Sequence, residues 1–140
     1  MKKILTILII ALVSISPIFA QNNSTKKADK LFDRLEFVKA AEEYLKLADK
    51  SPDNYIIGKL ADSYYNIFNT REAEKWYSKI VNDDPDSEVI FRYSEMLKAN
   101  GKYKESNVWM SKFSEIKPYD TRAIAFRNTP NYIDKIIKKG

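Results

Sequence analysis

The sequence predicts an all-α protein, an α-solenoid of helical hairpins, because one motif occurs three times at an interval of 33 residues. Each copy has a small residue, a large residue four positions later, an apolar residue three positions after that, and a closing proline. The copies are Ala40, Tyr44, Leu47 and Pro52; Ala73, Tyr77, Ile80 and Pro85; and Ser106, Met110, Phe113 and Pro118. Offsets of 0, 4 and 7 place these side chains on one face of a helix. A period of this length indicates stacked units that bury their apolar faces against their neighbours.

An earlier amphipathic segment in each copy predicts a second helix per repeat. Its apolar residues are Leu31 and Phe32 in the first copy, Ile57, Leu60, Ala61 and Tyr64 in the second, and Ile90, Tyr93 and Leu97 in the third. We expect the turn between the two helices at Asn69 and at Asn100-Gly101, because these residues tolerate the left-handed conformation that ends a helix. Each copy closes with a proline, which cannot continue a helix, and an aspartate, which can accept hydrogen bonds from the start of the next helix. These pairs are Pro52 and Asp53, Pro85 and Asp86, and Pro118 and Asp120.

The small residue of each motif is expected where the two helices cross, since a larger side chain would hold the backbones apart. With the closing proline, this pattern resembles the tetratricopeptide repeat (TPR) family, whose unit is a helix-turn-helix. The resemblance extends over residues 24–119 and implies three repeats within residues 21–119, at about 21–53, 54–86 and 87–119. The chain departs from the family in its period, which is one residue short of the usual 34. It also departs at Ser106, which replaces an alanine, and at Thr70, which replaces an aromatic residue. The expected fold is an α-solenoid of three TPR helix-turn-helix repeats plus a C-terminal capping or linker helix.

Residues 1–20 have the pattern of a secretory signal peptide, with cleavage expected between Ala20 and Gln21. Two lysines precede an apolar run over residues 4–15, and small residues lead up to the cleavage point. The alternative is an uncleaved membrane anchor, but the run is shorter than the roughly 20 residues that a spanning helix needs. The sequence has no cysteine, which excludes a lipid anchor attached through cysteine. We therefore expect an exported protein that is periplasmic or associated with the outer membrane.

Residues 120–140 are predicted to be a C-terminal cap or linker. A short helix over residues 120–126 would cover the last repeat, because the ends of a solenoid need a partly polar cap. Beyond it, Tyr132, Ile133, Ile136 and Ile137 would share one face of a second short helix, and that face needs a partner. Two interpretations are open: this segment folds back on the third repeat, or it leads into further domains of a larger protein.

Composition excludes several classes of function. Of the formal net charge of +5, residues 1–20 carry +2 and residues 122–140 carry +4, which leaves −1 for residues 21–121. Nucleic-acid binding requires a clustered basic surface, so we expect no nucleic-acid partner. The sequence has neither histidine nor cysteine and only three glycines, which removes the commonest general base, thiol chemistry and a glycine-rich phosphate loop. We expect no enzymatic activity, cofactor, metal or small-molecule substrate.

The surface expected to bind a partner is the concave face, which in the TPR family is lined by the first helices of the repeats. By register its residues are Asp29, Lys59, Asp62, Tyr65, Asn66, Glu88, Arg92, Glu95 and Lys98. Mixed charge with an exposed aromatic suits an extended peptide or a loop of another protein; the alternative is an ordinary solvated surface. TPR modules that hold a peptide's C-terminal carboxylate use two lysines, two asparagines and one arginine. The corresponding positions here are Thr25, Asp29, Lys59, Glu88 and Arg92, of which only Arg92 matches.

Together these patterns predict an exported TPR scaffold that binds another envelope protein or a peptide segment. More loosely, the chain resembles the N-terminal TPR region of Bacteroidetes envelope proteins that carry an OmpA-like domain, some of which serve type IX secretion. The alternative prediction is a small structural envelope protein that self-associates through its C-terminal tail.

Overall fold

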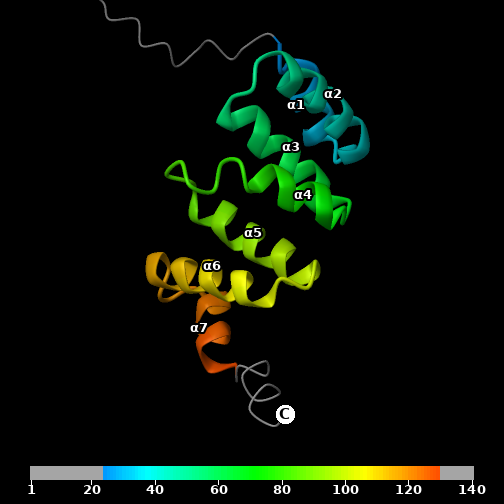
Figure 1. Cartoon of the computed structure of the whole chain (residues 1–140). Helices are drawn as coiled ribbons and strands as arrows, with labels where there is room; N and C mark the ends of the chain where they lie inside the picture. Colours follow the sequence, from blue (N-terminus) through cyan, green and yellow to red (C-terminus); the bar gives the residue numbers. More distant parts are fainter. Residues whose placement is uncertain (1–23, 130–140) are drawn as a thin grey trace, which may run out of the picture.

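The computed structural model describes residues 24–129, which form seven α-helices and no strand within that range (Figure 1). The helices are α1 (Lys26–Asp33), α2 (Phe37–Lys50), α3 (Asn54–Asn66), α4 (Thr70–Tyr77), α5 (Ser87–Ala99), α6 (Tyr103–Ile116) and α7 (Thr121–Asn128). The predicted signal peptide and the predicted helix containing Tyr132 and Ile136 lie outside the described residues.

The first six helices form three hairpins, α1–α2, α3–α4 and α5–α6, stacked in chain order with α7 after the last (Figure 1). Each helix packs against its neighbours in sequence, and α3, the first helix of the second hairpin, also contacts α5, the first helix of the third. This arrangement confirms the predicted α-solenoid of three helix-turn-helix repeats with a C-terminal helix.

The core confirms the register of the repeated motif. The small residues Ala40, Ala73 and Ser106 are all buried, so paired helices can approach closely where they cross. Tyr44, Tyr77 and Phe113 are fully buried and are the largest side chains to be so in the described chain. Each hairpin therefore contributes the same helix face to one continuous core.

The turns within the three hairpins share one backbone geometry, and the sequence predicted its left-handed residue correctly in only part of them. Leu35, Phe68 and Gly101, spaced 33 residues apart, have φ of 62°, 57° and 80°. At each turn the left-handed residue donates to a carbonyl three residues back, and the next residue donates to one five residues back, as in a Schellman motif. The prediction was right at Gly101 but wrong at Asn69, because Phe68 takes the left-handed conformation and the Asn69 side chain caps α4.

The turns between repeats follow the prediction. Asp53, Asp86 and Asp120 are the N-cap residues of α3, α5 and α7. Each accepts a hydrogen bond from a backbone N–H in the first turn of its helix. These caps fix where the first helix of each successive unit begins.

The second hairpin departs from the repeat because α4 is short, with 8 residues against 14 in both α2 and α6. After Tyr77 the backbone continues in tighter turns, with hydrogen bonds such as Ile80 N–H to the Tyr77 carbonyl at 3.1 Å. Ile80 and Val81 nevertheless remain buried. Two features oppose a longer helix: these β-branched residues, and the acids Asp83 and Asp84, which would face the negative end of the helix dipole.

Candidate partner-binding face

The first helices of the hairpins, together with α7, form the surface that the sequence assigned to partner binding, which we call the first-helix face. It contains acidic residues at one register position, Asp29 on α1, Asp62 on α3 and Glu95 on α5. Three other positions recur with each acid. They are the residue three positions later, which is aromatic in the first two sets, the residue 15 positions later on the second helix of the same hairpin, and the residue 30 positions later on the helix that begins the next unit. We call each such set a rung of the face.

The first rung surrounds Asp29 with hydroxyl donors. Tyr44 and Tyr55 donate to its Oδ1 atom at 2.6 and 2.8 Å, and Thr25 donates to Oδ2 at 2.8 Å. Burial acts to raise the pKa of Asp29, but these hydrogen bonds and the charge of Lys59 outweigh it, so the pKa lies below 3.8. Burial and the bond to Asp29 raise the pKa of Tyr55 to about 12.

Lys59 completes this rung from the next first helix. Its Nζ atom lies 4.0 Å from the centre of the Phe32 ring, within the range of a cation–π interaction. The first rung thus combines an acid, a tyrosine hydroxyl, a cation and an aromatic ring.

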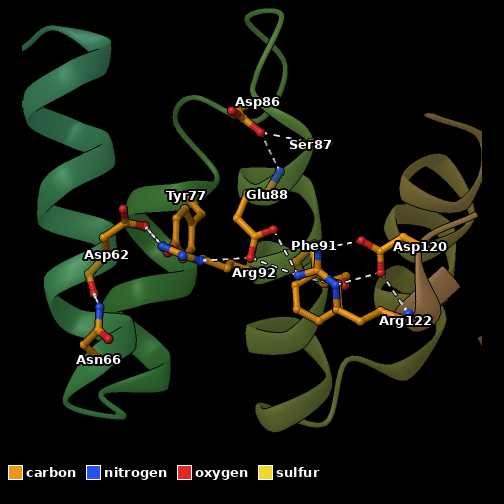
Figure 2. Close-up of polar contacts among 11 residues, drawn as sticks. Asp62, Asn66, Tyr77, Asp86, Ser87, Glu88, Phe91, Arg92, Asp120 and Arg122 are labelled. Atoms are coloured by element: carbon orange, nitrogen blue, oxygen red, sulfur yellow. Dashed lines mark hydrogen bonds and ion pairs between the residues drawn. The ribbon is translucent and has the colours of Figure 1, made fainter. Parts of the chain in front are cut away.

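The second rung repeats these four components with a direct ion pair. Tyr77 and Arg92 both approach Oδ1 of Asp62, the hydroxyl at 2.6 Å and the Nη1 atom at 2.7 Å (Figure 2). The guanidinium of Arg92 lies 5.2 Å from the centre of the Tyr65 ring. Burial acts to lower the pKa of Arg92, but the Asp62 carboxylate raises it overall. Burial, and then the same carboxylate, raise the pKa of Tyr77.

A chain of ion pairs continues from this rung to α7 (Figure 2). Arg122 donates through Nη1 to both oxygens of Glu88 at 3.0 Å and through Nη2 to Asp120 at 2.9 Å. Its guanidinium also lies 4.1 Å from the centre of the Phe91 ring. Hydrogen bonds from Arg122 lower the pKa of Asp120 to about 2. Arg122 therefore ties the last helix to the third repeat.

The structure brings together only part of the predicted site. Asp62, Tyr65, Glu88 and Arg92 form one connected cluster on α3 and α5. Asn66 instead donates to the Asp62 carbonyl of its own helix at 2.7 Å. Glu95 is half-buried and Lys98 is exposed, and both line a groove described below. The role of all nine residues in partner binding stays a prediction.

Sequence reasoning missed Tyr55, Asp120 and Arg122 as members of this face. Tyr55 and Glu88 occupy equivalent positions in successive repeats, one donating to an acid and the other accepting from arginines. The spacings of 15 and 30 residues between acids and their partners were the available signal.

Two grooves lie on the surface of the described repeats. One, of about 740 Å³, lies between α5, α6 and α7 and is lined by apolar Phe91, Met110 and Phe126 as well as by Glu95 and Lys98. The other, of about 600 Å³, lies between α4 and the α5–α6 turn. There Asn100 donates to Glu74 at 2.7 Å and joins the second repeat to the third. The larger groove is the only one of the two that opens beside the predicted site residues.

Three negative findings apply to the described residues. Within residues 24–129, no group of three or more metal-ligating side chains is placed to hold an ion. In the same range, every buried polar side-chain atom has a hydrogen-bond partner. None of the helices over residues 24–129 combines the length and apolar character that crossing a membrane requires.

Comparison with protein-family models and with curated proteins finds no match for this chain. Among solved structures, the chain is similar to the second TPR domain of human RPAP3, determined by NMR in complex with the HSP70 peptide SGPTIEEVD. The match has 20% sequence identity and a TM-score of 0.62, and it covers 74% of this chain and 88% of the other. At this identity the likeness establishes the fold.

Proposed function

We propose that this chain is a non-enzymatic binding module that holds an extended segment of another protein on its first-helix face. The observation that carries the proposal is the groove of about 740 Å³ beside the ion-pair cluster of α5 and α7. It combines apolar walls with a few charged groups, as sites that bind extended segments do. The peptide bound by the second TPR domain of RPAP3 supports a peptide partner for the same fold.

The partner differs in charge from that peptide, which ends in Glu-Glu-Val-Asp. On this chain the positions that would meet an acidic terminus include Asp29 and Glu88. Asp29 is held in its ionised form by three hydroxyl donors, so a second carboxylate beside it would be repelled. The face therefore suits a segment with neutral or basic side chains.

The bacterial cell envelope is the setting that we propose. Support comes from the signal-peptide pattern of residues 1–20 and from the looser resemblance to OmpA-like and type IX secretion-associated proteins, which place TPR repeats before their other domains. Expression of the full chain in a Gram-negative host should yield a periplasmic or membrane-associated product beginning at Gln21. A product that stays in the cytoplasm with residues 1–20 attached would contradict export.

Site-specific photocrosslinking tests the binding proposal in the full chain. Benzoylphenylalanine replaces Lys98 on the first-helix face or, as a matched control, Val108 on α6; both positions are exposed, and only Lys98 lines the groove. We expect one discrete crosslinked protein from position 98 in envelope extract of the source organism and none from position 108. Equal crosslinking from both positions, or crosslinking from position 108 alone, would contradict the proposal.

Self-association is a second candidate, favoured by exposed apolar residues near the C-terminal end of the stack. Ile116, Tyr119 and Ile124 are 53%, 91% and 39% exposed. Sedimentation of the full chain and of a variant with Tyr119→Ser and Ile124→Ser distinguishes the two candidates. A concentration-dependent oligomer that the variant lacks supports self-association, whereas a monomer in both supports a module that binds another protein.

A further inference from the structure

The third rung of the first-helix face is incomplete. Its acid is Glu95, but Met110 stands where the first two rungs have a tyrosine, and Ala125 stands where they have Lys59 and Arg92. Lys98 stands where they have an aromatic ring, Phe32 or Tyr65. Among the described residues, none forms a hydrogen bond or ion pair with the Glu95 carboxylate, although Glu95 is half-buried.

The groove lies where the missing side chains would be. All four positions of the third rung, Glu95, Lys98, Met110 and Ala125, line it. Arg122 fixes α7 in this position through Glu88 and Asp120. The methyl group of Ala125 replaces a long cationic side chain, so the space that such a side chain would fill remains next to Glu95.

We propose that this groove binds a lysine or arginine side chain of the partner segment, with Glu95 as its counter-ion. The proposal rests on the proposed function and specifies the chemistry of the partner. The first two rungs show what this position accepts: Arg92 pairs with Asp62 at 2.7 Å, and Lys59 lies over Phe32. The partner's cation enters where the chain itself supplies one in the earlier repeats.

The walls of the groove suit the aliphatic stem of such a side chain. Met110, Phe91 and Phe126 supply apolar surface along which a stem can pack while its charged end reaches the carboxylate. The two arginines that line the groove are otherwise engaged. Arg122 pairs with Glu88 and Asp120, and Arg127 donates to the Ser114 hydroxyl and the Pro118 carbonyl.

Arg127 keeps its charge, because it donates only to uncharged oxygens, and Lys98 is the component of the rung itself that opposes a cation. It is exposed, lies one turn from Glu95, and forms no ion pair with another described residue. Restoring the ring of the earlier rungs should therefore improve binding. Lys98→Tyr removes a like charge and adds a surface for a cation–π interaction, which should raise the affinity about two- to five-fold.

The test titrates the full chain with N-acetyl-arginine amide and, as a neutral isostere, N-acetyl-citrulline amide, while NMR follows the methyl groups of Met110 and Ala125. We expect saturable shifts with the arginine probe only. Glu95→Gln should weaken binding about ten-fold, as expected for loss of a charge-assisted contact, whereas the matched variant Glu105→Gln on the exposed side of α6 should not. Ala125→Arg fills the groove from within and should abolish binding.

Each contrary outcome has a defined meaning. Equal shifts with both probes, or arginine binding unchanged by Glu95→Gln, would overturn the proposal. Absence of arginine binding by the parent chain would also overturn it. If, in that case, a variant with Lys135, Lys138 and Lys139 replaced by glutamine does bind the arginine probe, the groove is occupied by one of the chain's own lysines and not by a cation of the partner. Crosslinking from position 98 tests the proposed function separately. A partner captured there by a chain that does not bind the arginine probe would leave the proposed binding module intact and remove only the role of Glu95.

Discussion

Tyr77 connects the core of the second repeat to the first-helix face. Its ring is fully buried, and its hydroxyl donates to Asp62 at 2.6 Å. We expect Tyr77→Ala to lower the free energy of unfolding by about 3–5 kcal/mol, because it leaves a cavity in the core. Tyr77→Phe should lower it by only about 1–2 kcal/mol, since Asp62 keeps its bond to Arg92.

Urea denaturation monitored by circular dichroism measures both changes. Tyr103→Ala provides the control, since Tyr103 occupies a surface position and is 49% exposed. Its substitution should change stability by no more than about 0.5 kcal/mol. A Tyr77→Ala variant as stable as Tyr103→Ala would show that the register of the core is wrong.

Asp29 predicts how the first repeat responds to acid. Its pKa in the folded chain lies below 3.8, so folding favours the ionised form. The stabilisation is fully present above the unfolded pKa and is lost as the pH falls through the lower, folded pKa. We expect Asp29→Asn to lower the free energy of unfolding by about 1–2 kcal/mol at pH 7, because a charged acceptor of three hydrogen bonds is lost from a partly solvated site.

Urea denaturation from pH 7 to pH 2.5 checks this prediction. The difference between the Asp29→Asn variant and the parent should shrink steadily below about pH 4. Asp49→Asn is a matched control at an exposed position of α2, and it should change the free energy of unfolding at pH 7 by no more than about 0.5 kcal/mol. A difference at pH 2.5 as large as that at pH 7 would contradict the role of the Asp29 charge.

At the scale of helices and turns, the sequence predicted which faces pack and where the repeats join, but not how every helix ends. The apolar spacing identified the core positions because burial of one helix face determines them. The left-handed residue was assigned by residue preference to Asn69, although the Schellman geometry puts it at Phe68. Register would have located it, since Gly101 is 33 residues after Phe68 and 66 after Leu35. The early end of α4 depends on the local preferences of the residues after Tyr77, such as the β-branched Ile80 and Val81, and the repeat spacing does not reveal these preferences.

The hairpin turns can be stabilised at two positions. Leu35 and Phe68 are 71% and 75% exposed and adopt a backbone conformation that is unfavourable for residues other than glycine. Replacing either by glycine should raise the free energy of unfolding by about 0.5–1 kcal/mol, because relief of the left-handed strain exceeds the added entropy of the unfolded chain. Gly101→Ala should have the opposite sign at the equivalent turn, where φ is 80°.

Thermal and urea unfolding of the three single variants measures these effects. Gly58→Ala is a useful comparison, because Gly58 lies within α3, where an added methyl group would meet the Ile80 side chain at an ordinary distance of 3.6 Å. That substitution should stabilise the helix by the usual difference in propensity, about 1 kcal/mol. Destabilisation by both Leu35→Gly and Phe68→Gly would show that these exposed side chains contribute contacts that outweigh the strain.

For the whole molecule, the arrangement of the first-helix face was only partly predictable. Register identified Asp62, Arg92 and Glu95 because equivalent positions recur on equivalent helices. It did not reveal that Asp62 would be bonded to Arg92 while Glu95 would have no such partner within residues 24–129. That difference depends on the residue 30 positions further on and on the placement of α7. Side-chain length also determines which residue bonds to the acid of the first rung. There Tyr55 reaches Asp29 at 2.8 Å, whereas Lys59 lies over the Phe32 ring.

A stack in which each unit contacts mainly its neighbours loses structure from its ends, so the attachment of α7 can be tested independently of the rest. α7 is held by Arg122, which pairs with Glu88 and Asp120, and by the buried Ala123. We expect Arg122→Ala to reduce hydrogen-exchange protection of residues 121–128 about 10- to 30-fold, which corresponds to about 1.4–2 kcal/mol for lost charge-assisted bonds. Protection of α1 to α4 should not change.

Arg71→Ala, at an exposed position of α4, is the control and should leave α7 as protected as in the parent. If Arg122→Ala lowers protection equally in all seven helices, the chain unfolds as one cooperative unit; if it lowers protection in none, contacts other than Arg122 hold α7, and the groove beside Glu95 is set by them.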